Sequence, residues 1–266
     1  MQKEYRMKQL SNTTISLLLG LIIITANAIS QPSPVANTAS ATRIVITYRC
    51  SPANRPALLQ EMRKNGEVRF AQWKREGAIQ DYLLLFNSFV DTTTWDMLAV
   101  ISFRNYQQTD RWRDIEEVYP GGLDSSLLKI AAPTGTFISE QKWHAGTVGD
   151  PKSALYLVIP YEHPDRGVYI DFVNSVLVPQ FAGWMKEGAV RSWTILLNNH
   201  YPGKPWDILL LLEYDGVRGL SQRGAARAAT EVQLKTDAGW KLLREISSQF
   251  RDEYEVSSAR VIVPIP

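Results

Sequence analysis

Residues 70–103 read FAQWKREGAIQDYLLLFNSFVDTTTWDMLAVISF, and residues 181–214 read FAGWMKEGAVRSWTILLNNHYPGKPWDILLLLEY. The two stretches align without a gap at an offset of 111 positions, and eleven of the aligned residues are identical. A period of this length is too long for the unit of a solenoid and matches a whole small domain. The alignment therefore indicates an internal duplication and predicts two copies of one fold in this chain.

Both copies show the same order of predicted elements. For the first copy, residues 42–149, we expect a strand at 44–48, a helix over 58–73, strands at 78–87 and 95–103, a helix from Thr109 and a strand at 135–143. For the second copy, residues 150–266, we expect a strand at 155–159, a helix over 169–184, strands at 189–198 and 206–214, a helix from Asp237 and a strand at 254–263. Gly77 and Gly188 supply the left-handed residue that commonly follows a helix. The β-α-β-β-α-β order is that of a ferredoxin-like unit.

The predicted strands are nearly continuous apolar runs, such as residues 83–86 and 208–212. Such strands are buried on both faces, so the face of each sheet that its own helices leave bare must also be covered. The fold class is therefore α+β, with two ferredoxin-like repeats packed sheet to sheet as a barrel within one chain. The second copy also inserts an Ala- and Arg-rich segment, residues 218–234, which predicts an extra surface helix.

This pattern resembles a known superfamily. The element order, the helix that ends in Glu-Gly and the Trp-Asp pair before an apolar strand are similar to the dimeric α/β-barrel superfamily in a tandem form. The resemblance covers residues 42–266 and implies a monomer with an internal pseudo-twofold axis, further oligomerisation being left open. The superfamily includes cofactor-free monooxygenases, haem-degrading enzymes, chlorite dismutases, dye-decolorising peroxidases and lactone isomerases. A fold shared by so many chemistries does not select one of them.

Residues 1–28 have the pattern of a secretory signal peptide. A basic start precedes an apolar run at residues 15–24, and Ala26-Asn27-Ala28 is a small-x-small cleavage pattern. We expect export to the periplasm or the medium with cleavage near Ala28, the alternative being an uncleaved anchor. The Pro-, Ser- and Thr-rich residues 29–41 predict a flexible spacer.

The net charge limits the classes of binding partner, and the cysteine content limits the disulfides that the chain can form. Cleavage would remove three basic residues and one acidic residue, which brings the formal charge of +2 to zero. A neutral mature protein has no electrostatic footprint for nucleic acid or an anionic membrane surface. The single cysteine, Cys50, excludes an intramolecular disulfide.

Motifs that name a reaction are absent from the sequence. It contains no nucleophile elbow, Gly-rich phosphate loop, paired-Cys zinc pattern or HExxH motif. Of the three histidines, His163 lies beside acidic residues in a loose metal-like cluster, which a solvated turn explains equally well. His144, expected in the linker, and His200, expected in a loop, are the candidates for a haem ligand at a strand end. No cofactor is expected, with haem as the alternative.

Residue pairs that both copies retain have a structural interpretation. Trp95-Asp96 and Trp206-Asp207 open the third strand of each copy and are expected to close the barrel end or the preceding turn. Asn87 and Asn198 are expected to bond nearby backbone groups at strand ends.

The weak candidates for a site are residues that differ between the copies, together with Asp207 of a retained pair. The catalytic candidates are Arg191, His200 and Asp207. The ligand-binding candidates are Tyr82, Trp193 and Glu213. A buried Arg191 near Trp193, facing Glu213 or Asp207, would make a polar spot in an apolar cavity. The alternative is a surface arginine whose stem covers the barrel rim.

Four functions remain open on this sequence. The favoured one is the binding of a small apolar or aromatic molecule in or beside the barrel. The alternatives are a cofactor-free monooxygenase or isomerase, a haem-binding protein, and a structural scaffold whose interior is filled by aromatic side chains.

Overall fold

The computed structural model describes residues 41–163, 165–247, 252–253 and 256–265, which belong to one compact unit. The predicted signal peptide, residues 1–28, and all of the predicted spacer except its last residue, Ala41, lie outside the described residues. Within the described part, no helix combines the length and the hydropathy that crossing a membrane requires.

The first half of the unit contains four strands and three α-helices. Its main elements are β1 (Ala41–Cys50), α2 (Arg55–Glu61), η3 (Met62–Gly66), α3 (Glu67–Arg75), β2 (Asp81–Asn87), β3 (Met97–Phe103), α4 (Thr109–Val118) and β4 (Ala131–Gly146). Short 3-10 turns occur at η2 (Pro52–Asn54), η4 (Tyr106–Gln108), η5 (Pro120–Gly122) and η6 (Leu127–Lys129). The strand β4 runs beyond its predicted end at Trp143, so His144 lies in a strand and the prediction of a linker was wrong. Pairing of His144 with Thr194 of the second half extends this strand.

The second half has a similar order of elements, with one added helix, α7, and one added two-residue strand, β8. Its elements are β5 (Leu155–Glu162), α5 (Arg166–Phe172), η7 (Val173–Leu177), α6 (Val178–Lys186), β6 (Val190–Asn198), β7 (Ile208–Tyr214), α7 (Gly216–Leu234), α8 (Ala238–Glu245), β8 (Asp252–Glu253) and β9 (Ser257–Val261). The added helix α7 covers the insertion that the sequence predicted to be helical. Asp237 caps α8, because its side chain accepts a hydrogen bond from the N–H of Trp240 at 2.9 Å.

The first helix of each half contains a π-turn, η3 in one and η7 in the other. A π-turn adds a residue to one helical turn and changes the direction of the side chains around it. Pro179 lies in the first turn of α6, directly after η7, where its missing N–H costs little. The first half has Val68 at the aligned position, so proline alone does not cause the π-turn. Both helices end as predicted at a glycine with positive φ, 71° at Gly77 and 73° at Gly188.

The described strands form one antiparallel sheet that closes on itself. The strand order is β7-β6-β4-β1-β3-β2-β9-β5-β8, and an additional pairing of β7 with β5 completes a ring of eight strands. The edges of the two halves are hydrogen-bonded to each other through β4 with β6 and β2 with β9. The protein is therefore an α+β protein with a closed eight-stranded barrel. Closure removes the exposed sheet edges that otherwise promote aggregation.

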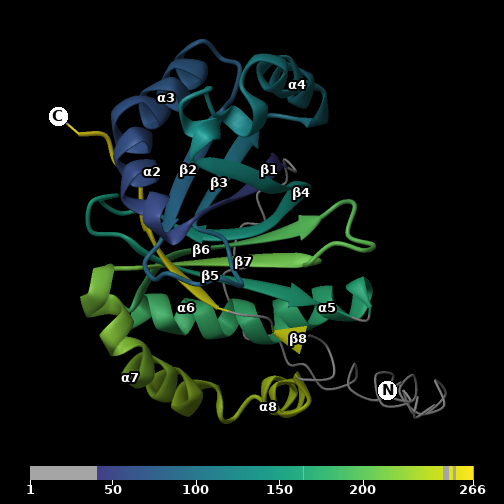
Figure 1. The fold of residues 1–266 in the computed structure, drawn as a ribbon. Helices are drawn as coiled ribbons and strands as arrows, with labels where there is room; N and C mark the ends of the chain where they lie inside the picture. The colour runs from purple at the N-terminus through teal and green to yellow at the C-terminus, as the bar shows by residue number, and fades with distance from the viewer. Residues whose placement is uncertain (1–40, 164, 248–251, 254–255, 266) are drawn as a thin grey trace, which may run out of the picture. The chain divides into compact units, whose positions relative to one another are not determined.

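Helices cover the barrel from two sides, with α2–α4 over the strands of the first half and α5–α8 over those of the second (Figure 1). The apolar residues between helices and strands form two clusters, one for each half. A third cluster contains strand residues of both halves that alternate with the helix-facing ones, and it fills the barrel interior. Its buried members are Val45, Leu85, Leu98, Val100, Phe137, Ala154, Tyr156, Val158, Leu196, Trp206, Leu209, Leu211 and Ala259.

Candidate functional site

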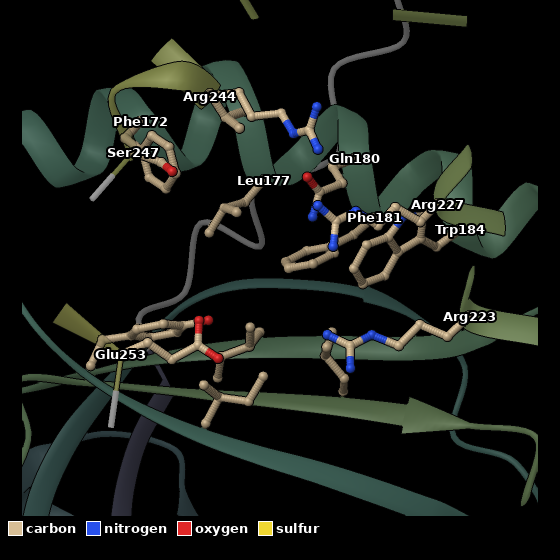
Figure 2. Close-up of a pocket in the computed structure, with 15 residues that line it drawn as sticks. Phe172, Leu177, Gln180, Phe181, Trp184, Arg223, Arg227, Arg244, Ser247 and Glu253 are labelled. Carbon is tan, nitrogen blue, oxygen red and sulfur yellow. The ribbon is translucent and has the colours of Figure 1, made fainter. Parts of the chain in front are cut away.

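A pocket of about 250 Å³ lies between the outer face of the second-half strands and helices α6, α7 and α8 (Figure 2). We call it the helix-side pocket. Its strand wall consists of outward-facing residues, because side chains of a strand alternate between its two faces. These residues are Ile159 and Tyr161 of β5 and Leu210 and Leu212 of β7.

The opposite wall is the helix that runs from α5 through η7 into α6. Apolar residues spaced by three or four positions face the strands from this helix. They are Phe172, Val176, Leu177, Phe181 and Trp184. Val176 and Leu177 belong to the π-turn η7, which therefore sets the direction of two side chains in this wall.

Three arginines line the same pocket, two from α7 and one from α8. Figure 2 shows Arg223, Arg227 and Arg244 together with Gln180 around the space between helices and strands. Arg223 and Arg227 are four residues apart and so share a face of α7. The pocket therefore combines an apolar, aromatic wall with cationic groups at its edge.

The three guanidinium groups differ in their carboxylate partners. Arg227 and Arg244 both pair with Glu231, at 2.9 and 2.5 Å. Arg223 has no carboxylate within 4.0 Å among the described residues, and its guanidinium carbon lies 5.8 Å from the ring centre of Trp184. Arg223 is thus half-buried, faces an aromatic ring and keeps its charge available for an anion.

The buried polar groups of the second half that lack a hydrogen-bond partner among the described residues include Nε1 of Trp184 and the hydroxyl of Tyr214. Burial raises the pKa of Tyr214 to about 12, and the positive charge of Arg223 acts in the opposite direction. Tyr214 therefore stays neutral at physiological pH. Trp184 lines the pocket, and its free N–H can donate to a ligand oxygen.

The sequence-based candidates do not converge on this pocket or on each other. Arg191 lies on the surface and pairs with Asp215 at 2.5 Å, so the expected buried arginine facing Glu213 or Asp207 is not what the fold contains. Tyr82 and Trp193 face the helices of their own halves. Tyr82 donates to Glu67 at 2.6 Å, and Trp193 packs on Phe181 with ring centres 5.3 Å apart.

Glu213, by contrast, points into the barrel and is fully buried. Its Oε1 accepts a hydrogen bond from the N–H of Gly149 at 2.7 Å. Its Oε2 accepts from the hydroxyls of Tyr156 at 3.0 Å and Ser192 at 2.6 Å. Burial, followed by the charge of Glu213, raises the pKa of Tyr156 far above its usual value. These donors satisfy the buried carboxylate and fix it within the barrel wall.

The remaining candidates lie at strand ends. Asp207 accepts a hydrogen bond from the N–H of His163 at 3.2 Å and is buried. His200 follows β6 in an exposed turn, and its N–H donates to the Asn198 side chain at 3.0 Å. Asn198 also donates to the carbonyl of Trp206 at 3.1 Å, which confirms the predicted backbone-bonding role of this asparagine.

The helix-side pocket offers little to hold haem. Haem iron takes His, Cys, Met or Tyr side chains as axial ligands, and among the described residues that line the pocket only Tyr161 is of these types. His144 is held by Thr194, with Nδ1 and Oγ1 2.9 Å apart, in β4. No group of three or more metal-ligating side chains occurs in the described ranges.

Sequence analysis missed the cationic residues of the pocket. Arg223 and Arg227 lie in the insertion 218–234, which the sequence predicted as a surface helix without a role. The four-residue spacing of two arginines beside small alanines was the available signal, because it places a charged stripe next to a face that can pack closely.

Comparison with known proteins adds evidence on the fold. No protein-family model and no curated protein sequence matches this chain. Solved structures match it over most of its length. An anthrone oxidase-like protein aligns with a TM-score of 0.54 at 14% identity, covering 85% of this chain and 93% of that one.

The chain adopts the dimeric α/β-barrel fold. A proposed monooxygenase from Fusobacterium nucleatum also aligns with a TM-score of 0.54, at 10% identity over 85% of this chain and 94% of the other. A variant of chlorite dismutase from Candidatus Nitrospira defluvii aligns with a TM-score of 0.51, at 10% identity over 85% and 92%. At these identities the dimeric α/β-barrel assignment concerns architecture and not activity.

Proposed function

We propose that this protein binds a small aromatic molecule that carries an anionic group, in the helix-side pocket. The observation that carries the proposal is Arg223, a half-buried cation without a carboxylate partner among the described residues, set over Trp184. An aromatic ligand would pack against Phe181 and Leu212, and its anionic group would face Arg223. Concave sites with mostly apolar walls and a few polar groups are the usual form of small-molecule sites.

The size and charge of the pocket support the same ligand class. A cavity of about 250 Å³ lies just below the usual range for ligand pockets, which begins at about 300 Å³, and suits one or two fused rings. Glu231 neutralises part of the charge of Arg227 and Arg244, and Glu253 of β8 is a further carboxylate in the wall. Arg223 remains the cation that an anionic ligand would contact.

Calorimetric titration with naphthalene-2-carboxylate tests this proposal. We expect Arg223→Ala to weaken binding about 10-fold, because it removes one charge-assisted hydrogen bond. The neutral analogue naphthalene-2-methanol should lose the same interaction and be insensitive to the substitution. Arg218→Ala is the matched control, since Arg218 lies on the same helix but is exposed and paired with Asp215.

A position-specific signal should accompany the titration. With 5-fluorotryptophan incorporated, the fluorine resonance of Trp184, assigned with Trp184→Phe, should shift as the ligand binds. A saturating titration that leaves this resonance in place, or equal affinities for the parent protein and Arg223→Ala, would reject the helix-side pocket as the binding site.

A second candidate function is cofactor-free monooxygenation of such a ligand. Two of the similar structures are an anthrone oxidase-like protein and a proposed monooxygenase. In this reaction a methylene group loses two hydrogens to one oxygen atom of O₂, giving a carbonyl and water. Arg223 would stabilise the enolate formed by proton loss, and Glu253 is a carboxylate of the wall that could accept the proton. Oxygen uptake with anthrone, compared between the parent protein and Arg223→Ala, tests it; uptake equal to that without protein rules it out.

We also infer that the barrel consists of two ferredoxin-like repeats in tandem, so that one chain closes it as a monomer. The aligned positions of β3 with β7 and of η3 with η7, each at the 111-residue offset of the sequence repeat, support this inference. Sedimentation of the purified protein at monomer mass over a range of concentrations is the expected result.

Export of the mature protein is proposed on the signal pattern of residues 1–28. Amino-terminal sequencing of the protein from the periplasm or the medium should begin at residue 29. An intact amino terminus in the cell pellet would contradict cleavage.

A further inference from the structure

A second cavity opens at one end of the barrel, where β1 and β5 end and β3 and β7 begin. We call it the barrel mouth; its volume is about 750 Å³. Its floor consists of inward-facing side chains from six strands. They are Thr47, Leu98, Phe137, Val158, Leu209 and Ser257. The barrel interior is thus packed in its middle and hollow at this end.

Aromatic rings form the walls of the barrel mouth. Trp95 and Trp206 occupy aligned positions of the two halves, immediately before β3 and β7, and both line the cavity. The ring of Trp206 packs on Phe137, with ring centres 4.8 Å apart and planes tilted by 46°. Trp206 is buried and Trp95 is half-buried, so the indole of Trp95 is the more accessible of the two for stacking on a planar ligand.

Two cations stand at the rim of the barrel mouth, and none of its lining residues is acidic. Nζ of Lys204 lies 5.9 Å from the ring centre of Phe137, and Arg49 donates a hydrogen bond to the carbonyl of Thr92 at 2.5 Å. Neither cation has a carboxylate within 4.0 Å among the described residues. Arg49 is half-buried and Lys204 is exposed, so a carboxylate at the rim would meet positive charge that no described carboxylate neutralises.

The hydroxyl of Thr47, one of the two hydroxyl groups of the floor, already has a partner. Oγ1 of Thr47 and Oγ1 of Thr134 are 3.1 Å apart and form a hydrogen bond with each other. The deep part of the cavity therefore offers apolar and aromatic contacts, and the charge is confined to the rim. This arrangement suits a molecule with a flat apolar body and one anionic end.

We propose that the barrel mouth is a second ligand site, distinct from the helix-side pocket, and that it takes a planar aromatic carboxylate. The ring system lies between the indoles of Trp95 and Trp206, over the floor residues Leu98 and Leu209. The carboxylate faces Lys204. The assignment stands independently of the function proposed for the helix-side pocket, because the two cavities share no lining residue.

Fluorine NMR of the whole protein, labelled with 5-fluorotryptophan, separates the two sites. The chain has eight tryptophans, and Trp95→Phe and Trp206→Phe assign the two resonances of the barrel mouth. On titration with naphthalene-2-carboxylate, we expect both resonances to shift with one common dissociation constant. Arg223→Ala should leave these two shifts unchanged. The result therefore does not depend on whether the helix-side pocket binds the ligand.

Two variants test the assignment, one by removing a charge at the rim and the other by filling the cavity. Lys204→Met should weaken the affinity read from these resonances about 5-fold through loss of one charged contact. Thr47→Phe fills the cavity and should abolish the shifts. Lys152→Met is the matched control, because Lys152 is an exposed lysine in a turn outside the barrel mouth. Unshifted Trp95 and Trp206 resonances at saturation, or an affinity unaffected by Lys204→Met, would overturn the proposal.

Discussion

Gly183 of α6 lies so close to Thr230 of α7 that a Cβ atom at position 183 would overlap the Thr230 side chain. The aligned residue of the first half is Gln72, which is exposed and donates a hydrogen bond to Glu76. The difference has a physical reason: the second half alone carries α7, and α7 can approach α6 only where a side chain is missing. The approach places Arg223 and Arg227 over the helix-side pocket.

Gly183→Ala should destabilise the protein by about 1–3 kcal/mol, because the methyl group overpacks a helix contact. Thr230→Ala in the same chain should recover part of the loss. Chemical denaturation measures both effects. Gly224→Ala is the control: Gly224 is exposed on α7 with no atom near its Cβ position, so the substitution should stabilise by up to about 1 kcal/mol. Equal gains at both glycines would show that the α6–α7 contact is loose.

Local sequence signals predicted the elements well where one residue decides the backbone. Gly77, Gly188 and the Asp237 cap are such cases. The faces of the strands could not be predicted in the same way. Residues 83–86 are all apolar, so polar and apolar side chains do not alternate along the strand and do not mark which face is which. The expected cavity face therefore contained Tyr82 and Trp193, although these face the helices, while Ser192 and Glu213 face the barrel. When the assignment of a strand is shifted by one residue, every side chain is placed on the opposite face of the sheet.

The helix-side pocket could not be predicted for a related reason. Arg223 becomes a site residue only because α7 folds back over α6, and that contact joins segments about 40 positions apart in sequence. A run of alanines and arginines is equally consistent with a solvated helix. The glycine at position 183, where the first copy has glutamine, marked the contact more specifically than the arginine spacing of α7 did.

The two halves also differ in the buried charges behind their first helices. Arg55 forms a buried ion pair with Asp96 and donates a second hydrogen bond to the carbonyl of Asn87 at 2.7 Å. The aligned Arg166 donates to the carbonyl of Asn198 at 2.6 Å but has no ion pair with Asp207 within 4.0 Å. We therefore expect Arg55→Met to cost about 3–5 kcal/mol, because it leaves Asp96 buried and unpaired.

Arg166→Met is the matched comparison and should cost clearly less in the same urea titration. Asp96→Asn combined with Arg55→Met should recover stability relative to Arg55→Met alone, since it removes the unpaired charge. Similar losses for Arg55→Met and Arg166→Met would mean that the hydrogen bonds to the strand-end carbonyls, and not the ion pair, carry the effect.

Because the ring of His163 is buried, we expect the folded protein to lose stability in mild acid. Its ring is buried and stacks on Tyr169 at 5.7 Å, and neither ring nitrogen has a hydrogen-bond partner among the described residues. Burial lowers the pKa of His163, while Asp207, whose Oδ2 is 4.0 Å from Nε2, acts in the opposite direction. With the folded-state pKa below that of the unfolded chain, the unfolded state binds the proton more readily. Stability is therefore full above about pH 6.5 and falls as the pH decreases further.

His163→Phe keeps the stacking on Tyr169 and removes the titration. The free energy of unfolding of the parent protein should fall between pH 7 and pH 5, and the variant should show a smaller fall over the same range. Parallel profiles for His163→Phe and the parent protein would show that folding does not lower the pKa of His163.

The buried carboxylate of Glu213 should be a major determinant of barrel stability. It accepts three hydrogen bonds, from the N–H of Gly149 and the hydroxyls of Tyr156 and Ser192. Glu213→Ala would leave these donors buried without an acceptor, at a cost of about 2–4 kcal/mol. The aligned residue of the first half is Ser102, so the network exists on one side of the barrel only.

The comparison of Glu213→Ala with Glu213→Gln separates the hydrogen bonds from the charge. Glu213→Gln keeps one carbonyl oxygen for a donor and should cost less than Glu213→Ala in thermal and chemical unfolding. Glu245→Ala, an exposed carboxylate of α8, should change stability by less than about 0.5 kcal/mol. Binding of naphthalene-2-carboxylate to Glu213→Gln should match that of the parent protein, because Glu213 lines neither cavity. A selective loss of binding without loss of stability would instead give this carboxylate a role in a ligand site.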